Sequence, residues 1–257
     1  MRGRAAIWNP NAGIRGHLEE SSVSDVLEKV CTFQDVEKQI QPHGAKHFSI
    51  SEELGPDMSR LQDVIVKELF FYHVKISEIP AWWFSNHTIH MLVVRNCPLR
   101  DIGEAAIVGM GQLFRLILEH DQLESLPSGL SAATRLRTLQ IRRNPIKFLT
   151  GVLQLPALTT LNLRSNEIEK IDEKFLLVSP NLKHLSLSGN RIQHIPNRLF
   201  KKTRKLETID FRDNRIMAIS NLFDGLLNLQ VRFSGKANKS ALFDSLITPN
   251  DRVVRTA

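Results

Sequence analysis

Residues 158–171 read LTTLNLRSNEIEKI, with apolar residues at positions one, four, six, eleven and fourteen and an asparagine at position nine. The pattern returns 24 residues later as LKHLSLSGNRIQHI in residues 182–195, and again as LETIDFRDNRIMAI in residues 206–219. One such unit cannot bury its own apolar face, so successive units must stack on one another. The sequence therefore predicts a solenoid.

Four earlier segments follow the same template, namely residues 66–79, 89–102, 113–126 and 136–149. Seven units thus span residues 66–228. Apolar residues at positions four and six alternate with polar ones, which predicts a short strand in each unit. Because the units stack in the same orientation, we expect their strands to lie side by side in one parallel sheet.

The asparagine at position nine is polar, yet the template turns it inward. Its side chain can bond to backbone groups of neighbouring coils, which would otherwise be unpaired in an apolar interior. Val74, Cys97 and Asp121 replace it in the first three units. We therefore expect this asparagine ladder to be weakest in those units.

The repeat resembles the leucine-rich repeats, and its 22 to 24-residue period with a late phenylalanine resembles their typical class. That late residue is supplied by Phe84, Phe175, Phe200 and Phe223. The resemblance implies an α/β fold, a leucine-rich repeat solenoid shaped as a curved horseshoe. Its concave side would carry the parallel sheet, and its convex side irregular or short helical segments. It further implies a non-enzymatic module that recognises a protein.

Residues 30–37, VCTFQDVE, together with Ile79-Pro80, resemble arthropod extracellular leucine-rich repeat proteins. These include proteins catalogued as the non-catalytic subunit of oplophorus luciferin monooxygenase. The resemblance implies secretion and, as an alternative function, an accessory subunit of an enzyme complex. Met1–Ser21 contains no continuous apolar run of the kind that forms a signal-peptide core. A cytoplasmic location therefore stays open beside an extracellular one, and a secreted origin would mean that the natural chain ends are missing.

The segments on either side of the repeats differ from the template. Residues 1–21 are expected to form a disordered lead. Residues 22–65 are expected to cap the solenoid with an amphipathic helix over residues 24–40 and a strand over residues 47–51. A cap is needed because an open end exposes a slice of core to water.

The C-terminal segment, residues 229–257, predicts a degenerate eighth repeat followed by a cap or tail. Leu229, Val231 and Phe233 alternate as in a repeat strand, and residues 241–247 suit a short helix. We expect the last ten residues, 248–257, to be loose.

The composition excludes several classes. The chain has 257 residues, 42% of them hydrophobic, and no apolar run approaches the ~18 to 20 residues that cross a bilayer. The cysteines, Cys31 and Cys97, show no CxxC spacing. Two buried free thiols are the simpler interpretation, and a disulfide is the alternative.

Motifs of catalysis and metal binding are missing from the sequence. The pairs His43/His47 and His87/His90 each lack the third protein ligand of a zinc site. We therefore predict no catalytic residue, no metal and no cofactor. Asn86 and Asn238 begin possible glycosylation sequons, which chance alone would provide about as often.

Positions two, three, five, seven and eight of each unit should face the concave side. Position five is apolar in the first three units, at Phe70, Val93 and Ile117, and Phe114 lies beside them. A water-facing apolar cluster usually marks a binding surface. The alternative is that residues 1–65 fold over it.

Position seven is rich in arginine, with Arg95, Arg142, Arg164 and Arg212. A mildly cationic face suits an acidic or glycosylated protein partner, although it is also compatible with simple solvation. Aromatic residues are scarce in the basic half, which argues against nucleic acid. The predicted partner-binding residues are Phe70, Val93, Arg95, Phe114, Ile117, Arg142, Arg164 and Arg212.

Overall fold

The computed structural model describes residues 47–50, 67–79, 84, 88–217, 222–223, 226, 229–233 and 252–255. The predicted lead over residues 1–21 and the predicted helices over residues 24–40 and 241–247 lie outside the described residues. Cys31 and both sequon asparagines lie outside them as well.

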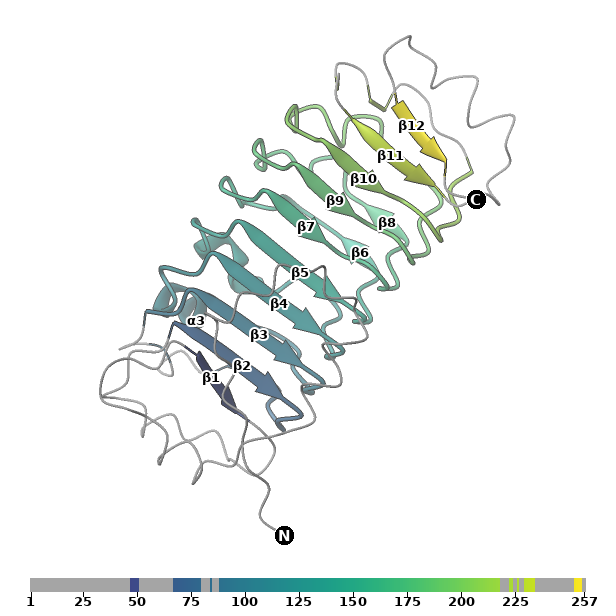
Figure 1. Ribbon diagram of the computed structural model, residues 1–257. Coiled ribbons are helices and arrows are strands. Elements are labelled where there is room, and N and C mark those ends of the chain that lie inside the picture. Colours follow the sequence, from purple (N-terminus) through teal and green to yellow (C-terminus); the bar gives the residue numbers. More distant parts are fainter. Residues whose placement is uncertain are drawn as a thin grey trace, which may run out of the picture.

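A ten-stranded parallel sheet runs along the solenoid, with its strands in chain order (Figure 1). The strands are β1 (His47–Ile50), β2 (Glu68–Tyr72), β3 (Met91–Arg95), β4 (Arg115–Glu119), β5 (Thr138–Arg142), β7 (Thr160–Asn162), β9 (His184–Ser186), β10 (Thr208–Asp210), β11 (Gln230–Phe233) and β12 (Arg252–Arg255). Equal template positions pair across the sheet, as in Leu139–Leu161–Leu185. The predicted parallel sheet and its register are therefore confirmed.

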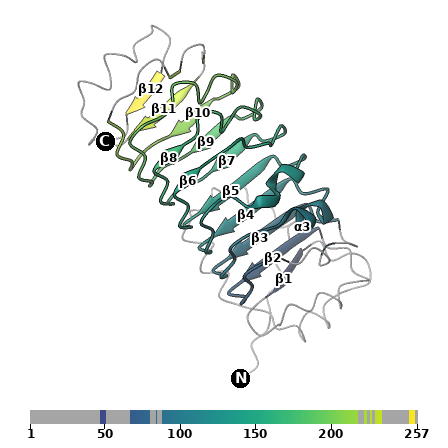
Figure 2. The ribbon, with the colours of Figure 1, turned by 180° about the vertical axis from the view of Figure 1, so that it is seen from behind.

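The opposite side of the coils is short-helical or irregular, as predicted (Figure 2). It carries α3 (Glu104–Gly109), the 3-10 helix η3 (Ser128–Ala132), and a two-stranded sheet of β6 (Phe148–Leu149) and β8 (Lys170–Ile171). A Cβ atom on Gly129 would lie 2.6 Å from the carbonyl carbon and oxygen of Gly103. The absence of a side chain at Gly129 thus lets η3 approach the start of α3.

The apolar template residues form one continuous core through the described coils. The late phenylalanines Phe84, Phe175, Phe200 and Phe223 are all buried, as predicted. The ring of Phe200 stacks on that of Phe223 with a centroid distance of 5.7 Å. In this part of the stack, one coil packs on the next through an aromatic contact as well as through leucines.

The residue at position eight of every described repeat adopts a left-handed backbone conformation. The φ angles lie between 54° and 67° at His73, Asn96, His120, Arg143, Ser165, Gly189 and Asp213. This turn ends each strand and directs position nine into the interior. Only Gly189 adopts the conformation without steric cost, since a Cβ atom disfavours positive φ.

The predicted asparagine ladder is present. Asn190 Nδ2 donates to the carbonyl oxygens of Leu187 (2.8 Å) and Leu163 (3.0 Å), and its Oδ1 accepts from the Ile168 N–H (3.0 Å). Equivalent bonds surround Asn144, Asn166 and Asn214. Each asparagine therefore completes backbone hydrogen bonds of the coil that precedes it.

The ladder has fewer bonds in the first repeats, as predicted. Cys97 is a free, buried cysteine, and burial raises the pKa of its thiol to about 11. Its Sγ lies 3.3 Å from the carbonyl oxygen of Arg95. Asp121 accepts one hydrogen bond through Oδ1, whereas its buried Oδ2 has no partner among the described residues.

Strand pairing extends the sheet beyond the seven repeats at both ends. β1 confirms the strand predicted over residues 47–51, and β11 confirms the strand predicted for the degenerate eighth repeat. The prediction that residues 248–257 are loose is wrong for Arg252–Arg255, which pair with β11 as β12. Without β12, the edge of β11 would have unpaired backbone groups. The valines at 253 and 254 favour the extended chain that pairs with them.

Candidate protein-binding face

The N-terminal half of the concave face carries exposed apolar surface. Phe114, directly before β4, is 42% exposed and lies against the ring of His90 at a centroid distance of 5.8 Å. Phe70 and Ile117 are half-buried, and Phe70 lies beside Tyr72 with ring centroids 6.1 Å apart. These three apolar side chains are where the sequence predicted them.

Val93 differs from its predicted water-facing role, because it is only 2% exposed. The register places it between Phe70 on β2 and Ile117 on β4. Its shorter side chain is thus flanked on both sides by larger ones. A partner on this face would meet Phe70 and Ile117 rather than Val93.

Glu119 organises the basic residues beside this apolar surface. It is 8% exposed, and its Oε2 lies 3.1 Å from Arg95 Nε and 2.9 Å from Arg142 Nη2. Its Oε1 lies 3.1 Å from Nη1 of Arg143. Three guanidinium groups thus surround one carboxylate, which leaves this Glu119 cluster with a formal charge of +2. Burial also raises the pKa of the neighbouring Tyr72, although the charge of Arg95 opposes the shift.

Arg212 is likewise held by a carboxylate, that of Asp210 at the end of β10. Its Nε and Nη2 donate to Oδ1 and Oδ2 of Asp210 at 3.0 and 2.8 Å. Burial alone would raise the pKa of Asp210, but the hydrogen bonds and charge of Arg212 outweigh it and lower this pKa. Arg164, in contrast, is exposed. Arg95, Arg142 and Arg212 are therefore held in ion pairs.

Sequence reasoning missed the role of Glu119. The sequence contains a signal for this ion-pair cluster, because Arg95, Glu119 and Arg142 all occupy position seven of the template. The register aligns them across β3, β4 and β5. Opposite charges on neighbouring strands attract one another. Comparing adjacent strands at one position would have predicted the cluster.

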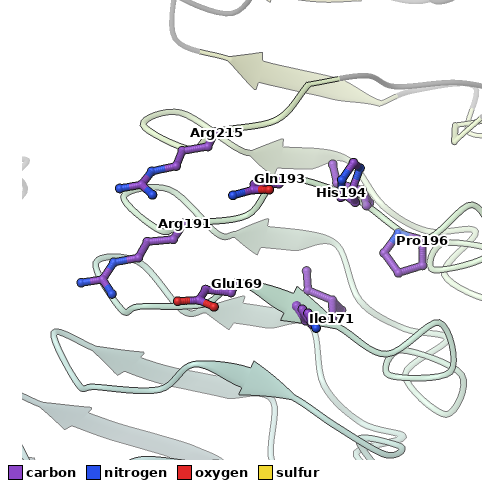
Figure 3. Close-up of a pocket in the computed structure, with 9 residues that line it drawn as sticks. Glu169, Ile171, Arg191, Gln193, His194, Pro196 and Arg215 are labelled. Atoms are coloured by element: carbon purple, nitrogen blue, oxygen red, sulfur yellow. The ribbon is translucent and has the colours of Figure 1, made fainter.

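A separate hollow of about 500 Å³ opens on the flank of the coils, beside β8 (Figure 3). It is lined by Glu169, Lys170, Ile171, Arg191, Gln193, His194, Ile195, Pro196 and Arg215. The sheet of β6 and β8 stops here because Pro196 has no N–H, whereas Asp172 at the same template position donates to Leu149. None of the eight predicted residues lines this hollow.

The described residues contain no group of three or more His, Cys, Asp or Glu side chains placed to hold a metal ion. Within the same part of the chain, no helix has the length and apolar character that crossing a bilayer requires.

Comparisons with known proteins agree with the geometry. Residues 134–190 and 180–231 match the family model described as leucine rich repeat. The solved structure "Crystal structure of TLR13-ssRNA13 complex" is similar over 74% of this chain, with a TM-score of 0.62 and 21% sequence identity. This chain spans 28% of the length of that structure's chain. The protein therefore has the fold of a leucine-rich repeat solenoid.

No curated protein matches the sequence. The narrower resemblance to the arthropod luciferase-associated proteins thus gains no support, and neither does the role of accessory subunit. Secretion stays a prediction from that resemblance. The matching repeats and structure are of a class that typically recognises other molecules without catalysis.

Proposed function

We propose that this protein is a non-enzymatic recognition module that binds a protein partner on the concave face of strands β2 to β5. The observation that carries the proposal is the exposure of Phe114, at 42%, on a face where Phe70 of β2 and Ile117 of β4 are also partly exposed. Contiguous apolar surface facing water commonly marks a site of association. Aromatic side chains in such a position give much binding energy when a partner covers them.

The Glu119 cluster supports an acidic partner. Its guanidinium groups are held in place before binding, so little side-chain entropy is lost when a partner contacts them. Arg143 is 54% exposed within the cluster, and Arg164 is exposed on the next coil. Carboxylate or sulfate groups of a protein or its glycans would complement the net positive charge. Arg212, which is ion-paired with Asp210, contributes mainly by shaping the surface.

A protein partner is preferred to nucleic acid, although the similar solved structure is a complex with an ssRNA. At 21% identity, that similarity concerns the fold alone. On the face itself, Glu119 and Asp210 offset part of the arginine charge. Nucleic-acid sites instead combine uncompensated cations with aromatic stacking platforms.

A site-specific photo-crosslinker tests the face. The crosslinking amino acid p-benzoylphenylalanine would replace Phe114, and in a matched control it would replace Val108, which is 61% exposed on α3. Position 114 should capture one protein in reproducible yield that position 108 does not. Capture from position 108 alone would contradict the proposal. A catalytic subunit captured in near-stoichiometric amount would favour the accessory-subunit alternative.

Binding kinetics with the captured partner test the roles of individual residues. Ile117→Asp should mainly speed dissociation, because it places a charge in the desolvated centre. Arg164→Glu should mainly slow association and weaken its salt dependence, since exposed charges act on encounter. Val108→Asp serves as the control for folding and charge. Unchanged kinetics in both concave variants would exclude this face.

A further inference from the structure

The turn that leads into β10 is strongly basic. Residues 198–205 read RLFKKTRK and contain no acidic residue. Leu199, Phe200 and Thr203 are buried, whereas all five basic residues are exposed. The Thr203 hydroxyl donates to the Phe200 carbonyl oxygen at 3.1 Å and helps to close the turn. The buried residues thus hold the cations outward in a fixed cluster.

The net positive charge of the chain is carried by the C-terminal quarter of its sequence, which includes this turn. Residues 191–257 contain 13 Lys and Arg against 6 Asp and Glu, a net charge of +7, which equals that of the full chain. Arg198 lies 3.7 Å from Glu173, and Lys205 donates to Asn181. The described residues place no carboxylate against Lys201 or Lys202. Much of the charge is therefore available to a partner.

The preceding coil presents apolar side chains at the matching positions. Leu177 and Val178 precede Lys201 and Lys202 by 24 residues in the repeat template, and they are 44% and 38% exposed. The turns that lead into β9 and β10 project next to each other at the edge where the strands begin (Figure 1). Together, residues 174–181 and 198–205 form a ridge, here named the turn ridge.

We propose that the turn ridge docks on the surface of an anionic lipid bilayer. Its lysines would attract acidic headgroups, and Leu177 and Val178 would enter the boundary between headgroups and acyl chains. A sulfated glycan or a nucleic acid would satisfy the cations but would give the apolar pair no matching environment. The combination of both features therefore favours lipid. This surface is separate from the concave face, which would stay open to a protein partner.

Vesicle co-sedimentation of the full chain tests the charge contribution. Wild-type protein should bind vesicles rich in phosphatidylserine and not vesicles of phosphatidylcholine alone. Lys201→Gln with Lys202→Gln should lower the partition coefficient by roughly fivefold per lysine, about 30-fold in total. The matched control is Lys147→Gln with Lys170→Gln, which removes the same charge at exposed positions beside and in the β6–β8 sheet. It should change partitioning by less than about twofold.

A second pair of substitutions tests the apolar contribution. Leu177→Asn with Val178→Asn should lower partitioning about tenfold without altering charge, because the inserted apolar area is lost. The four substituted side chains, at positions 177, 178, 201 and 202, are all exposed. Each variant should therefore melt at the wild-type temperature. Where a double variant melts lower, the single substitutions Lys201→Gln and Leu177→Asn replace it.

Three results would overturn the proposal. The first is a wild-type protein that does not bind phosphatidylserine vesicles. The second is an equal loss of binding in the ridge and control lysine pairs, which would indicate general electrostatic attraction. The third is a combination of two findings. The double variant Lys201→Gln with Lys202→Gln no longer binds heparin or a single-stranded oligonucleotide, and the double variant Leu177→Asn with Val178→Asn binds vesicles as the wild type does. That last result would make the ridge a polyanion site.

Discussion

Oδ1 of Asp121 accepts a hydrogen bond from the backbone N–H of Cys97 at 3.0 Å, and no described side chain or backbone group hydrogen-bonds to the buried Oδ2. In each of the next four repeats an asparagine occupies this position, and its Nδ2 donates to backbone carbonyl oxygens. An ionised aspartate cannot donate. The third coil therefore contains a carboxyl group where the ladder requires a donor.

The stability of the protein should depend on the protonation of Asp121. Burial, with a contribution from the charge of Glu119, raises the pKa of Asp121 from 3.8 to about 8. Because the folded chain holds this proton more tightly than the unfolded chain, the stabilisation is complete below about pH 4. It is lost as the pH rises from about 4 to 8.

Asp121→Asn should remove that loss and restore a donor. We expect the free energy of unfolding at pH 8 to rise by roughly 1 to 3 kcal/mol. Urea unfolding between about pH 5 and 9 would measure this free energy in the wild type and the variant. Glu169→Gln is the control, because Glu169 is exposed. If wild type and Asp121→Asn show parallel pH curves, Asp121 is not the titrating group.

Asn190→Ala should destabilise the central solenoid. It would leave the Ile168 N–H and the Leu163 carbonyl oxygen without their side-chain partner. The expected cost is about 1 to 3 kcal/mol, because both groups are buried. Asn162→Ala is the control, since Asn162 is half-buried and caps only the N–H of Arg164. A wild-type melting temperature for Asn190→Ala would show that the ladder does not stabilise the fold.

Two glycine substitutions should have opposite effects. A Cβ atom at Gly129 would meet the backbone of Gly103 at 2.6 Å, so Gly129→Ala should cost about 1 to 3 kcal/mol. Nothing lies within 4 Å of a Cβ atom at Gly103, whose φ of −68° suits any residue. Gly103→Ala should therefore be neutral or stabilise by up to about 1 kcal/mol. Differential scanning calorimetry would compare them, and equal destabilisation would mean that α3 and η3 do not pack as described.

Removing the charge of Glu119 should be much more harmful than removing one of its arginines. Glu119→Gln removes the carboxylate charge that Arg95 and Arg142 share in a half-buried setting, at an expected cost of about 1 to 3 kcal/mol. Arg143→Gln should cost less than about 1 kcal/mol, because that side chain is 54% exposed. Chemical denaturation in low and high salt would measure the free energy of unfolding of both variants. Similar small losses would show that the Glu119 cluster is solvated.

The fold could be predicted from sequence because it repeats. Leu185, Asn190 and Phe200 recur with their counterparts at fixed intervals, so each position was identified several times over. The left-handed turn at position eight gave no such signal, since it is occupied by residues as different as Arg143 and Ser165. β12 also escaped prediction, because its pairing depends on the edge of β11 and not on its own periodicity.

The candidate site could be predicted only in outline. Ile117 followed from its template position, because alternation along a strand determines which residues face out. Phe114, which precedes β4, followed from its template position alone. The burial of Val93 depends on the sizes of Phe70 and Ile117 in neighbouring coils. The Glu119 cluster likewise depends on neighbours that are 23 or 24 residues away in sequence. Such properties belong to the stack and not to one unit.

The direction of the asparagine bonds bears on how the protein is made. Asn190 bonds to Leu163 and Ile168, which belong to the coil synthesised before it. A coil emerging from the ribosome therefore lacks these bonds until the asparagine of the next coil, 24 residues later in this case, has followed. At ~5 to 20 residues per second that delay is roughly 1 to 5 seconds per coil. The most recently synthesised coil of a nascent chain therefore has backbone groups without their asparagine partner. A stall in translation would prolong this incompletely bonded state.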